Sequence, residues 1–376
     1  MDAQELFYLL ALTRITTISL IDTHVLYQTL GSAKAIYEHR NDLKEIVPEG
    51  TQRLFTVMKN WDEALKRAEV ETEFIIKKKI SCLCKGQPDY PQRLEECPDT
   101  PLVLFYKGNA DLNTSRIISI VGTRRCTAYG KDVCQSLLRE LSAYDKNILI
   151  ISGLAYGIDI NAHRRALENG MATVGVLAHG LDTIYPALHR KTAIEMLTQG
   201  GLLTEYMSET NADKRNFVQR NRIVAGLADA TVVIESAQKG GSLITAGIAE
   251  SYHRDCFAFP GRNNDPLSQG CNELIRKNQA ILIQSGKDLI ESLCWDDLFA
   301  GINNRAKNRP LYETIQLSDN EKKIVSILKD VECKQINQMT VECNLPISTL
   351  SSLLFDMELK GLVRPSAGGV YRLVKN

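Results

Sequence analysis

Residues 215–250 read RNFVQRNRIVAGLADATVVIESAQKGGSLITAGIAE, and they decide the fold because they place a basic helical stretch, a buried strand and a glycine-rich turn in succession. Within them, residues 230–235 are short, apolar and β-branched, which is typical of a parallel strand covered on both faces. Gly240, Gly241 and Ser242 then lead into a helix. Backbone N–H groups at such a turn are unpaired and, together with the helix dipole, favour an anion. The segment therefore predicts a phosphate site.

The helical stretch before this strand is cationic and carries an aromatic ring. Arg220 and Arg222 flank Asn221, and two guanidinium groups beside free backbone amides indicate a site for phosphates. Lys214, Phe217 and Arg220 follow one another at three-residue spacing, so they share one face of a helix. Such a face suits single-stranded nucleic acid, whose phosphates meet the charges while an exposed base stacks on the ring. The alternative is that Phe217 packs in the core beneath solvated basic residues.

Length and composition limit the classes of protein to which this site can belong. The chain has 376 residues, 44% hydrophobic and 24% charged, as expected for a globular protein of two or three domains. No apolar run approaches the roughly 18 residues of a membrane helix, and MDAQELFYLL does not resemble a signal peptide, so we expect a cytoplasmic protein with no membrane partner. The ten cysteines show no zinc-type spacing, so no metal is expected. Because the formal net charge is zero, a local basic patch must hold any polyanion.

The first part of the chain predicts helices and then an irregular connection. Residues 1–75 have helical spacing of apolar residues and are expected to form a small helical domain of SAM or helix-hairpin-helix type. This domain could contact DNA through helix ends or serve as a protein-contact module, and TRITTIS lacks the glycine-rich hairpin of a DNA-binding type. Residues 77–113 contain four prolines around the strand LVLFYKG, which is expected to add an edge strand to the next domain.

Strand and helix patterns alternate from residue 116 to about 293. Helical segments such as KDVCQSLLRELSAY and GIDINAHRRALENG separate the apolar runs. This alternation predicts an α/β fold with a Rossmann-like, doubly wound, mostly parallel sheet, in a domain covering 76–295. Ligands of such sheets bind at the carboxyl ends of the strands. The expected strands are RIISIVG, NILIISG, ATVGVLAHG, GLLTEY, ATVVIES, DCFAFPG and AILIQS.

Three further strand ends carry unusual residues. The first, VGTRR at 121–125, is neither a dinucleotide fingerprint nor a P-loop, so no nucleotide cofactor is expected, but Arg124 near a helix start suits phosphate. The second, SGLAYGID at 152–159, has small residues that let a ligand approach the backbone, and Asp159 either contacts that ligand or caps a helix. The third contains His179, which we expect to be structural or ligand-contacting because no nucleophile elbow accompanies it. No catalytic residue is predicted.

Six sequence blocks follow one another in the chain: VGTRRCTAYG, SGLAYGIDINAHRRAL, VLAHGLDTIYP, FVQRNRIVAGL, GGSLITA and PGRNNDPLSQGCNELI. Taken together and in this order, they closely resemble the DNA processing protein A family, also called DprA or Smf. The resemblance implies a protein that binds single-stranded DNA without catalysis, protects incoming strands during natural transformation and loads the recombinase RecA onto them. It also implies a homodimer through the carboxyl-terminal side of the Rossmann domain, near residues 255–295, with RecA bound in an overlapping area.

The resemblance also implies which residues form the site. Lys214 and Phe217 are similar to the family's basic and aromatic contacts. Two positions depart from the family pattern, since Tyr156 stands where Arg is usual and Gly240 replaces a common Ser. The phosphate pocket implied by the family comprises Gly122, Thr123, Arg124, Ser152, Gly153, Arg220, Asn221, Arg222, Gly240, Gly241, Ser242 and Thr245.

The last part of the chain predicts a linker at 296–316 and a winged-helix domain at 317–376. Ser318 is expected to cap the first helix in a capping box with Glu321. A helix-turn-helix pattern with Pro346 at the turn follows, and RPSAGGVYRLV closes it as a hairpin. The expected recognition helix carries little positive charge, so a protein-contact or regulatory role is favoured over reading of duplex DNA.

A second class of function is a nucleotide-processing enzyme that cleaves the N-glycosidic bond of nucleoside monophosphates. Rossmann proteins of that kind resemble this chain in a Gly-Gly turn followed by Thr and acids. Their turn contains a third glycine and is followed by two adjacent glutamates, whereas GGSLITAGIAE lacks that glycine and Glu250 stands alone. Catalysis at the sugar would need a carboxylate at the pocket floor.

Overall fold

A computed structural model of the chain describes residues 2–15, 18–295, 317–329, 331, 333–366 and 369–374. The chain divides into two compact units, Met1–Ser292 and Leu293–Asn376. The predicted linker at 296–316 lies outside the described residues. Among the described helices, none is long and apolar enough to cross a membrane.

The first unit is built on a nine-stranded sheet with the order β1-β2-β6-β5-β4-β3-β7-β8-β9. From β6 to β9 in this order the strands run parallel to one another, while β2 pairs antiparallel with both β1 and β6. The mostly parallel Rossmann-like sheet is therefore confirmed. The segment LVLFYKG joins this sheet as β2, but it is not the predicted edge strand, because β2 lies between β1 and β6. The strands are β1 (Ser81–Cys84), β2 (Val103–Gly108), β3 (Ile117–Val121), β4 (Leu149–Ser152), β5 (Thr173–Val176), β6 (Gly200–Thr204), β7 (Ala230–Val233), β8 (Asp255–Ala258) and β9 (Ile281–Leu282).

Helices cover both faces of this sheet. Right-handed crossovers place α8, α9 and α10 on one face, because β3 to β6 step outward in one direction, and α14 packs on α8. The other face is covered by α7, α11, α12 and α13, whose side chains share one hydrophobic core. These helices are α7 (Gln92–Glu95), α8 (Ala128–Tyr144), α9 (Ile158–Glu168), α10 (Arg190–Met196), α11 (Lys214–Gly226), α12 (Gly241–Ser251), α13 (Gln269–Arg276) and α14 (Gly286–Ser292).

The strand order creates a crevice beside β3. From β3 the chain proceeds through β4 and β5 to β6 on one side, then returns through α11 to β7 on the other side of β3. The connections that follow β3 and β7 therefore diverge to opposite faces of the sheet. Ligands of doubly wound folds bind at such a topological switch point, outside the carboxyl ends of the strands. All residues of β3 and β7 are buried, so these two strands give the crevice a rigid floor.

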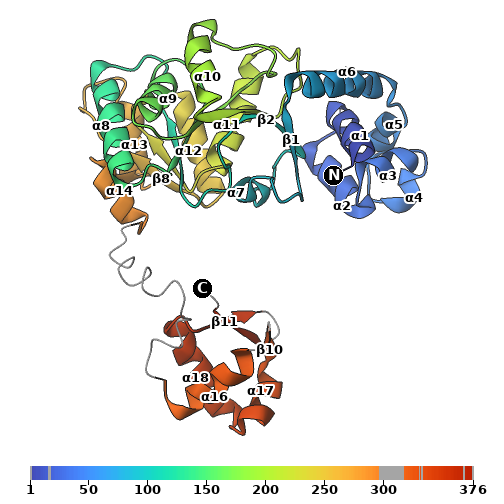
Figure 1. Cartoon of the computed structure of the whole chain (residues 1–376), viewed down its shortest axis with the longest axis vertical. Coiled ribbons are helices and arrows are strands. Elements are labelled where there is room, and N and C mark those ends of the chain that lie inside the picture. The colour runs from blue at the N-terminus through green and yellow to red at the C-terminus, as the bar shows by residue number, and fades with distance from the viewer. Residues whose placement is uncertain are drawn as a thin grey trace. The chain divides into compact units, whose positions relative to one another are not determined.

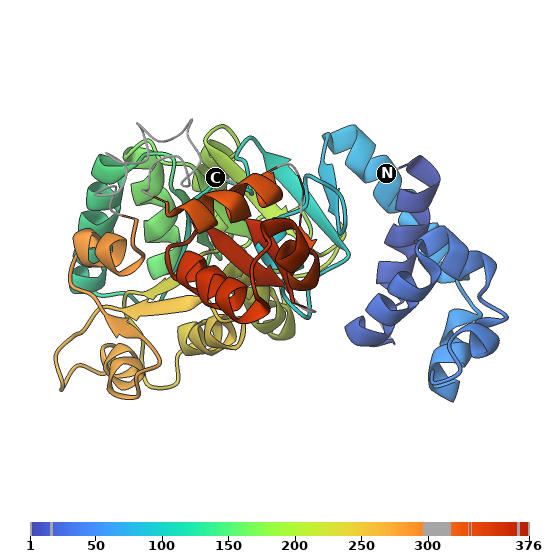
Figure 2. The same ribbon diagram turned by 90° about the horizontal axis from the view of Figure 1, so that it is seen from below.

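A helical region precedes the sheet and packs against its β1–β2 edge (Figure 1), and a view from below shows it at the same edge (Figure 2). Its core includes Val103 and Phe105 of β2, so it shares apolar contacts with the Rossmann sheet. A buried carboxylate adds a polar link, because Glu71 accepts hydrogen bonds from the backbone N–H and the hydroxyl of Ser208. The helices are α1 (Ala3–Arg14), α2 (Leu20–Leu30), α3 (Ala33–Glu38), α4 (Leu43–Ile46), α5 (Gln52–Met58) and α6 (Asp62–Lys78).

The second unit is a winged helix, as predicted. Its small sheet has the order β10-β12-β11 and packs with three helices around one hydrophobic core. The predicted capping box is confirmed, because Ser318 N–H donates to Glu321 at 2.8 Å and Glu321 N–H donates to the Ser318 hydroxyl at 3.4 Å. The elements are α16 (Asp319–Lys329), β10 (Lys334–Gln335), α17 (Ile336–Cys343), α18 (Ile347–Leu359), β11 (Val363–Ser366) and β12 (Val370–Leu373).

Candidate nucleic-acid interface

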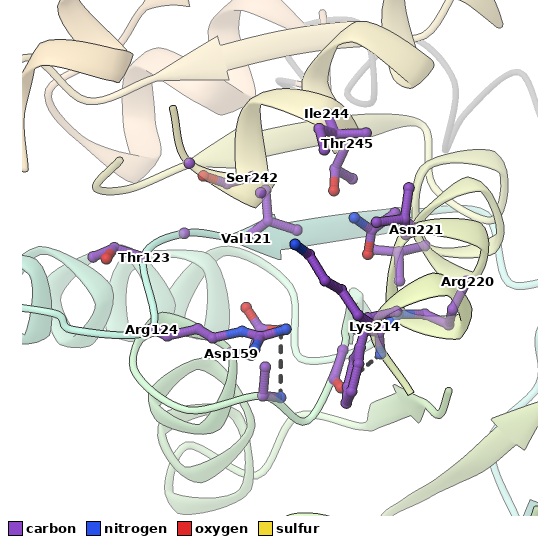
Figure 3. Close-up of a pocket in the computed structure, with 18 of the residues that line it drawn as sticks. Val121, Thr123, Arg124, Asp159, Lys214, Arg220, Asn221, Ser242, Ile244 and Thr245 are labelled. Carbon is purple, nitrogen blue, oxygen red and sulfur yellow. Dashed lines mark hydrogen bonds between the residues drawn. The ribbon is translucent and has the colours of Figure 1, made fainter. Parts of the chain in front are cut away.

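A cavity of about 680 Å³ lies at the carboxyl ends of β3, β4 and β7, at the switch point of the sheet (Figure 3). Helices α11 and α12 supply its remaining walls. It brings together twelve of the predicted site residues, from four separate stretches of the chain: Gly122, Thr123, Arg124, Gly153, Lys214, Phe217, Arg220, Asn221, Gly240, Gly241, Ser242 and Thr245.

The start of α12 gives the cavity an anion-binding character. Gly240 is the N-cap residue, and no side chain of the described residues caps the helix there. By contrast, α8 is capped by Thr127, whose hydroxyl accepts from Gly130 N–H at 3.2 Å and donates to buried Glu235 at 2.6 Å. The Ser242 hydroxyl donates to Ser236 at 2.8 Å, and Leu243 N–H donates to the Gly240 carbonyl at 3.2 Å, so the backbone N–H groups of Gly241 and Ser242 are left to meet a ligand. Such a helix end attracts phosphate through these groups and through the helix dipole.

Three exposed cations line the same cavity: Arg124, Lys214 and Lys239. Within the described part of the chain, none of them forms an ion pair with a carboxylate. Figure 3 shows Arg124 extending into the cavity from the β3 side and Lys214 extending from α11 toward the same space. The Arg124 guanidinium also lies over the Phe217 ring, 4.9 Å from its centroid. Cations without a carboxylate partner, placed beside free backbone amides, attract anions.

Arg220 stabilises the cavity wall from the interior of the protein. It is 3% exposed, and its Nη1 donates to the carbonyl oxygens of Gly153, at 2.6 Å, and Val176. Burial lowers the pKa of Arg220 to about 10, and Asp159 acts in the opposite direction. A Cβ at residue 153 would lie 2.5 Å from Arg220 Nη2, so a larger residue there would displace this guanidinium. Arg220 therefore fixes the loop after β4 and adds positive potential to the cavity.

Asp159 is the one carboxylate among the described residues that line the cavity. Burial raises the pKa of this group, while Arg220 opposes the shift. Its Oδ2 accepts from Ala155 N–H at 3.4 Å, so the carboxylate holds the loop after β4. Asp159 lies in the first turn of α9 and Gly157 is the N-cap residue, so Asp159 does not cap this helix.

Two predicted site residues lie elsewhere. Ser152 is fully buried, and its hydroxyl donates to the Ile120 carbonyl at 2.6 Å, which ties β4 to β3. Arg222 faces away from the described cavity lining, because its Nη2 donates to Glu205 and its Nε lies 3.8 Å from Asp99. Burial raises the pKa of Glu205, and the guanidinium of Arg222 acts in the opposite direction. Arg222 and Glu205 therefore form a largely buried ion pair, with side chains 13% and 16% exposed.

The cavity also contains residues that sequence reasoning did not assign to the site. Lys239 directly precedes the glycine turn, so its place beside the expected anion site could have been predicted from the sequence. Tyr185 lines the cavity from the connection after β5, and no local pattern placed it near Phe217.

His179 is structural, because its ring is buried and accepts the backbone N–H of Tyr185 at 3.2 Å.

These features define the class of the protein as a Rossmann-type α/β protein with a cationic, anion-binding cavity at its switch point. A family model for DNA recombination-mediator protein A matches residues 81–294, and a model for the DprA winged helix domain matches residues 310–369. The chain belongs to the DNA recombination-mediator protein A family, as the resemblance predicted.

Curated relatives and solved structures agree with this membership. The chain is 39% identical to DNA processing protein DprA of Streptococcus pneumoniae over 54% of this chain and 70% of the relative, and 41% identical to that of Bacillus subtilis over 57% and 71%. The X-ray structure of the Streptococcus pneumoniae protein matches with a TM-score of 0.57 and 31% identity, over 73% of this chain and 98% of that chain. A structure of Helicobacter pylori DNA processing protein A, solved to describe its single-stranded DNA binding mode, matches with a TM-score of 0.52 and 33% identity, over 58% and 97%.

Proposed function

We propose that this protein binds single-stranded DNA by its phosphate backbone in the cavity at the switch point, and that it acts as a recombination mediator. The observation that carries the proposal is the convergence of unpaired Arg124, Lys214 and Lys239 on the uncapped start of α12. The net charge of the chain is zero, so this local patch supplies the attraction for a polyanion. The binding mode described for the Helicobacter pylori relative supports the same ligand class.

The proposed contacts are a subset of the residues predicted from the sequence. The bound DNA strand can approach the loops closely at three small residues, Gly122, Thr123 and Gly153. Backbone N–H groups for its phosphates come from the glycine turn that starts at Gly240, at Gly241 and Ser242. Asn221 and Thr245 complete the polar lining. Ser152 and Arg222 are left out as DNA contacts, since the Ser152 hydroxyl bonds to a backbone carbonyl and the Arg222 guanidinium is paired with Glu205.

The family also suggests partners, which we adopt as part of the proposal. RecA loading during natural transformation is the expected role, and a homodimer would form through the carboxyl-terminal side of the Rossmann domain. Edge strand β9 supports the dimer, because Ile281 is 50% exposed and Leu282 is 46% exposed there. Light scattering of the full chain tests this assembly, and a monomer at micromolar concentration would contradict it.

The winged helix is proposed to contact protein. Helix α18 occupies the position of a recognition helix but contains neither Arg nor Lys. Three large apolar side chains of this helix are exposed instead, since Ile347 is 52%, Phe355 60% and Leu359 73% exposed. Reading of duplex DNA depends on side chains that hydrogen-bond to base edges, whereas apolar groups of this size suit a protein surface.

A role without catalysis is favoured over N-glycosidic bond cleavage. The enzyme would need a carboxylate at the floor of the cavity. Glu250 lies outside the described lining and accepts a hydrogen bond from Gln279 at 3.2 Å. Asp159 is buried beside Arg220 and holds the backbone of its own loop. Free base released from nucleoside monophosphates would be measured by chromatography, and robust turnover would contradict this part of the proposal.

The function is tested by fluorescence anisotropy of the full chain with labelled oligo-dT and with a matched duplex across a salt series. We expect tighter binding to the single strand, and binding that weakens steadily as salt rises, because phosphate binding releases counterions. Equal binding to the duplex, or binding that salt does not affect, would contradict the proposal.

A further inference from the structure

We infer that Tyr185 is the ring on which a base of the bound strand stacks, and that Phe217 supports that ring and the neighbouring guanidinium groups. This inference rests on the proposed function and deepens it. It names a base contact in a site whose other proposed contacts are to the phosphate backbone.

The two rings differ in how freely a base could reach them. Phe217 is half-buried, with the guanidinium of Arg124 4.9 Å and that of Arg220 5.9 Å from its centroid. Tyr185 lies against it with ring centroids 5.8 Å apart and planes tilted by 55°. Phe217 is therefore already surrounded by two cations and a ring, whereas Tyr185 is 50% exposed and lines the same cavity.

The backbone of Tyr185 is held in place although its ring is exposed. His179 Nε2 accepts the Tyr185 backbone N–H at 3.2 Å, and His179 Nδ1 lies 2.8 Å from the Gly180 carbonyl. A carbonyl can only accept, so Nδ1 carries the proton and Nε2 is free to accept. His179 is itself 1% exposed. A ring on an anchored backbone can bind a base with little further loss of conformational freedom.

The position of Tyr185 fits the chemistry of a single strand. Arg124 and Lys214 provide charges for the phosphates, and the exposed ring lies against Phe217 in the wall of the same cavity. Stacking of bases on aromatic side chains is tolerant of sequence, because every base has a π face. An exposed ring at this place would add affinity for bases without adding preference among them.

The inference is tested with the full chain in a two-by-two experiment. Wild type and Tyr185→Ala are titrated with oligo-dT and with an oligonucleotide of the same length whose sugars carry no bases. We expect Tyr185→Ala to weaken oligo-dT binding by about 5- to 160-fold, the range for loss of one stacked base. Binding to the abasic strand and the salt dependence should stay unchanged, because the phosphate contacts remain.

Two control variants separate stacking from general damage. Tyr185→Phe keeps the ring and should bind oligo-dT as wild type does. Tyr129→Ala removes a ring that is 42% exposed but lies outside the described lining of the cavity, and it should have no effect. Equal losses on both oligonucleotides in Tyr185→Ala, or no loss on either, would overturn the inference. Failure of wild type to bind the abasic strand at low salt would instead contradict the proposed backbone binding.

Discussion

Replacing Arg222 by methionine is expected to lower the free energy of unfolding by about 3–5 kcal/mol, the usual cost of removing one partner from a buried ion pair. The carboxylate of Glu205 would be left buried without its guanidinium, and burial already raises the pKa of that group. Asp99 would lose the same neighbour, although its side chain is more exposed. Urea denaturation at neutral pH measures the change, provided that the transition of the Rossmann unit is resolved from that of the winged helix.

A double variant serves as the control for this prediction. Arg222→Met combined with Glu205→Leu removes both charges, and buried pairs replaced in this way by apolar groups often lose little stability or none. The double variant should therefore recover much of the stability that Arg222→Met loses. If Arg222→Met instead keeps its stability and binds single-stranded DNA more weakly with a smaller salt slope, then Arg222 contacts phosphate and the ion pair is secondary.

Removing Arg124 and Lys214 together is expected to cause the largest loss of DNA affinity. Both side chains are exposed, unpaired within the described chain and directed into the cavity. A hydrogen bond from a charged group contributes about 1.5–3 kcal/mol, and removing one cation that neutralises a phosphate reduces the single-strand salt slope by roughly 0.7. The double variant Arg124→Ala, Lys214→Ala should thus bind far more weakly and with a slope flatter by about 1.4, because two phosphates are no longer neutralised.

A matched double variant controls for the change in net charge. Arg125 and Arg215 are exposed neighbours of the two cations and lie outside the described lining of the cavity. Arg125→Ala, Arg215→Ala removes the same charge from adjacent positions and should change affinity and slope only slightly. Thermal unfolding should be nearly unaffected in both double variants, since exposed substitutions usually change stability by no more than about 0.5 kcal/mol. Equal losses of affinity in the two would show that general attraction, and not the cavity, holds the strand.

Much of the fold could be predicted because its signals are local. Each expected strand of the Rossmann region is present, and the capping box of Ser318 and Glu321 was evident from their spacing. The strand order could not be predicted, since pairing of β3 with β7 joins segments about a hundred residues apart and no local pattern encodes it. The sequence likewise predicted residues 1–75 as a separate helical domain. It could not show that this region contacts the sheet domain, because Ser208, which donates to Glu71, lies 137 positions further along the chain.

The location of the candidate site could be predicted from the sequence, but the roles of some of its side chains could not. Glycines and Arg124 at strand ends indicated the cavity, because parallel strands end at one edge of a sheet. The sequence alone could not show which side chains of α11 face the cavity. Arg220 and Arg222 are two positions apart on one helix and therefore point in different directions, one to the loop after β4 and the other to Glu205. Which of the two faced a carboxylate depended on residues distant in sequence.

The central claim is that single-stranded DNA occupies the cavity at the switch point, and hydrogen–deuterium exchange of the full chain with and without oligo-dT tests it most directly. Bound phosphates would hydrogen-bond to backbone N–H groups, so exchange should slow in residues 122–125 and 237–243, together with the start of α11. Protection confined to the winged helix or to the helical region at 2–78, with these loops unchanged, would contradict the claim.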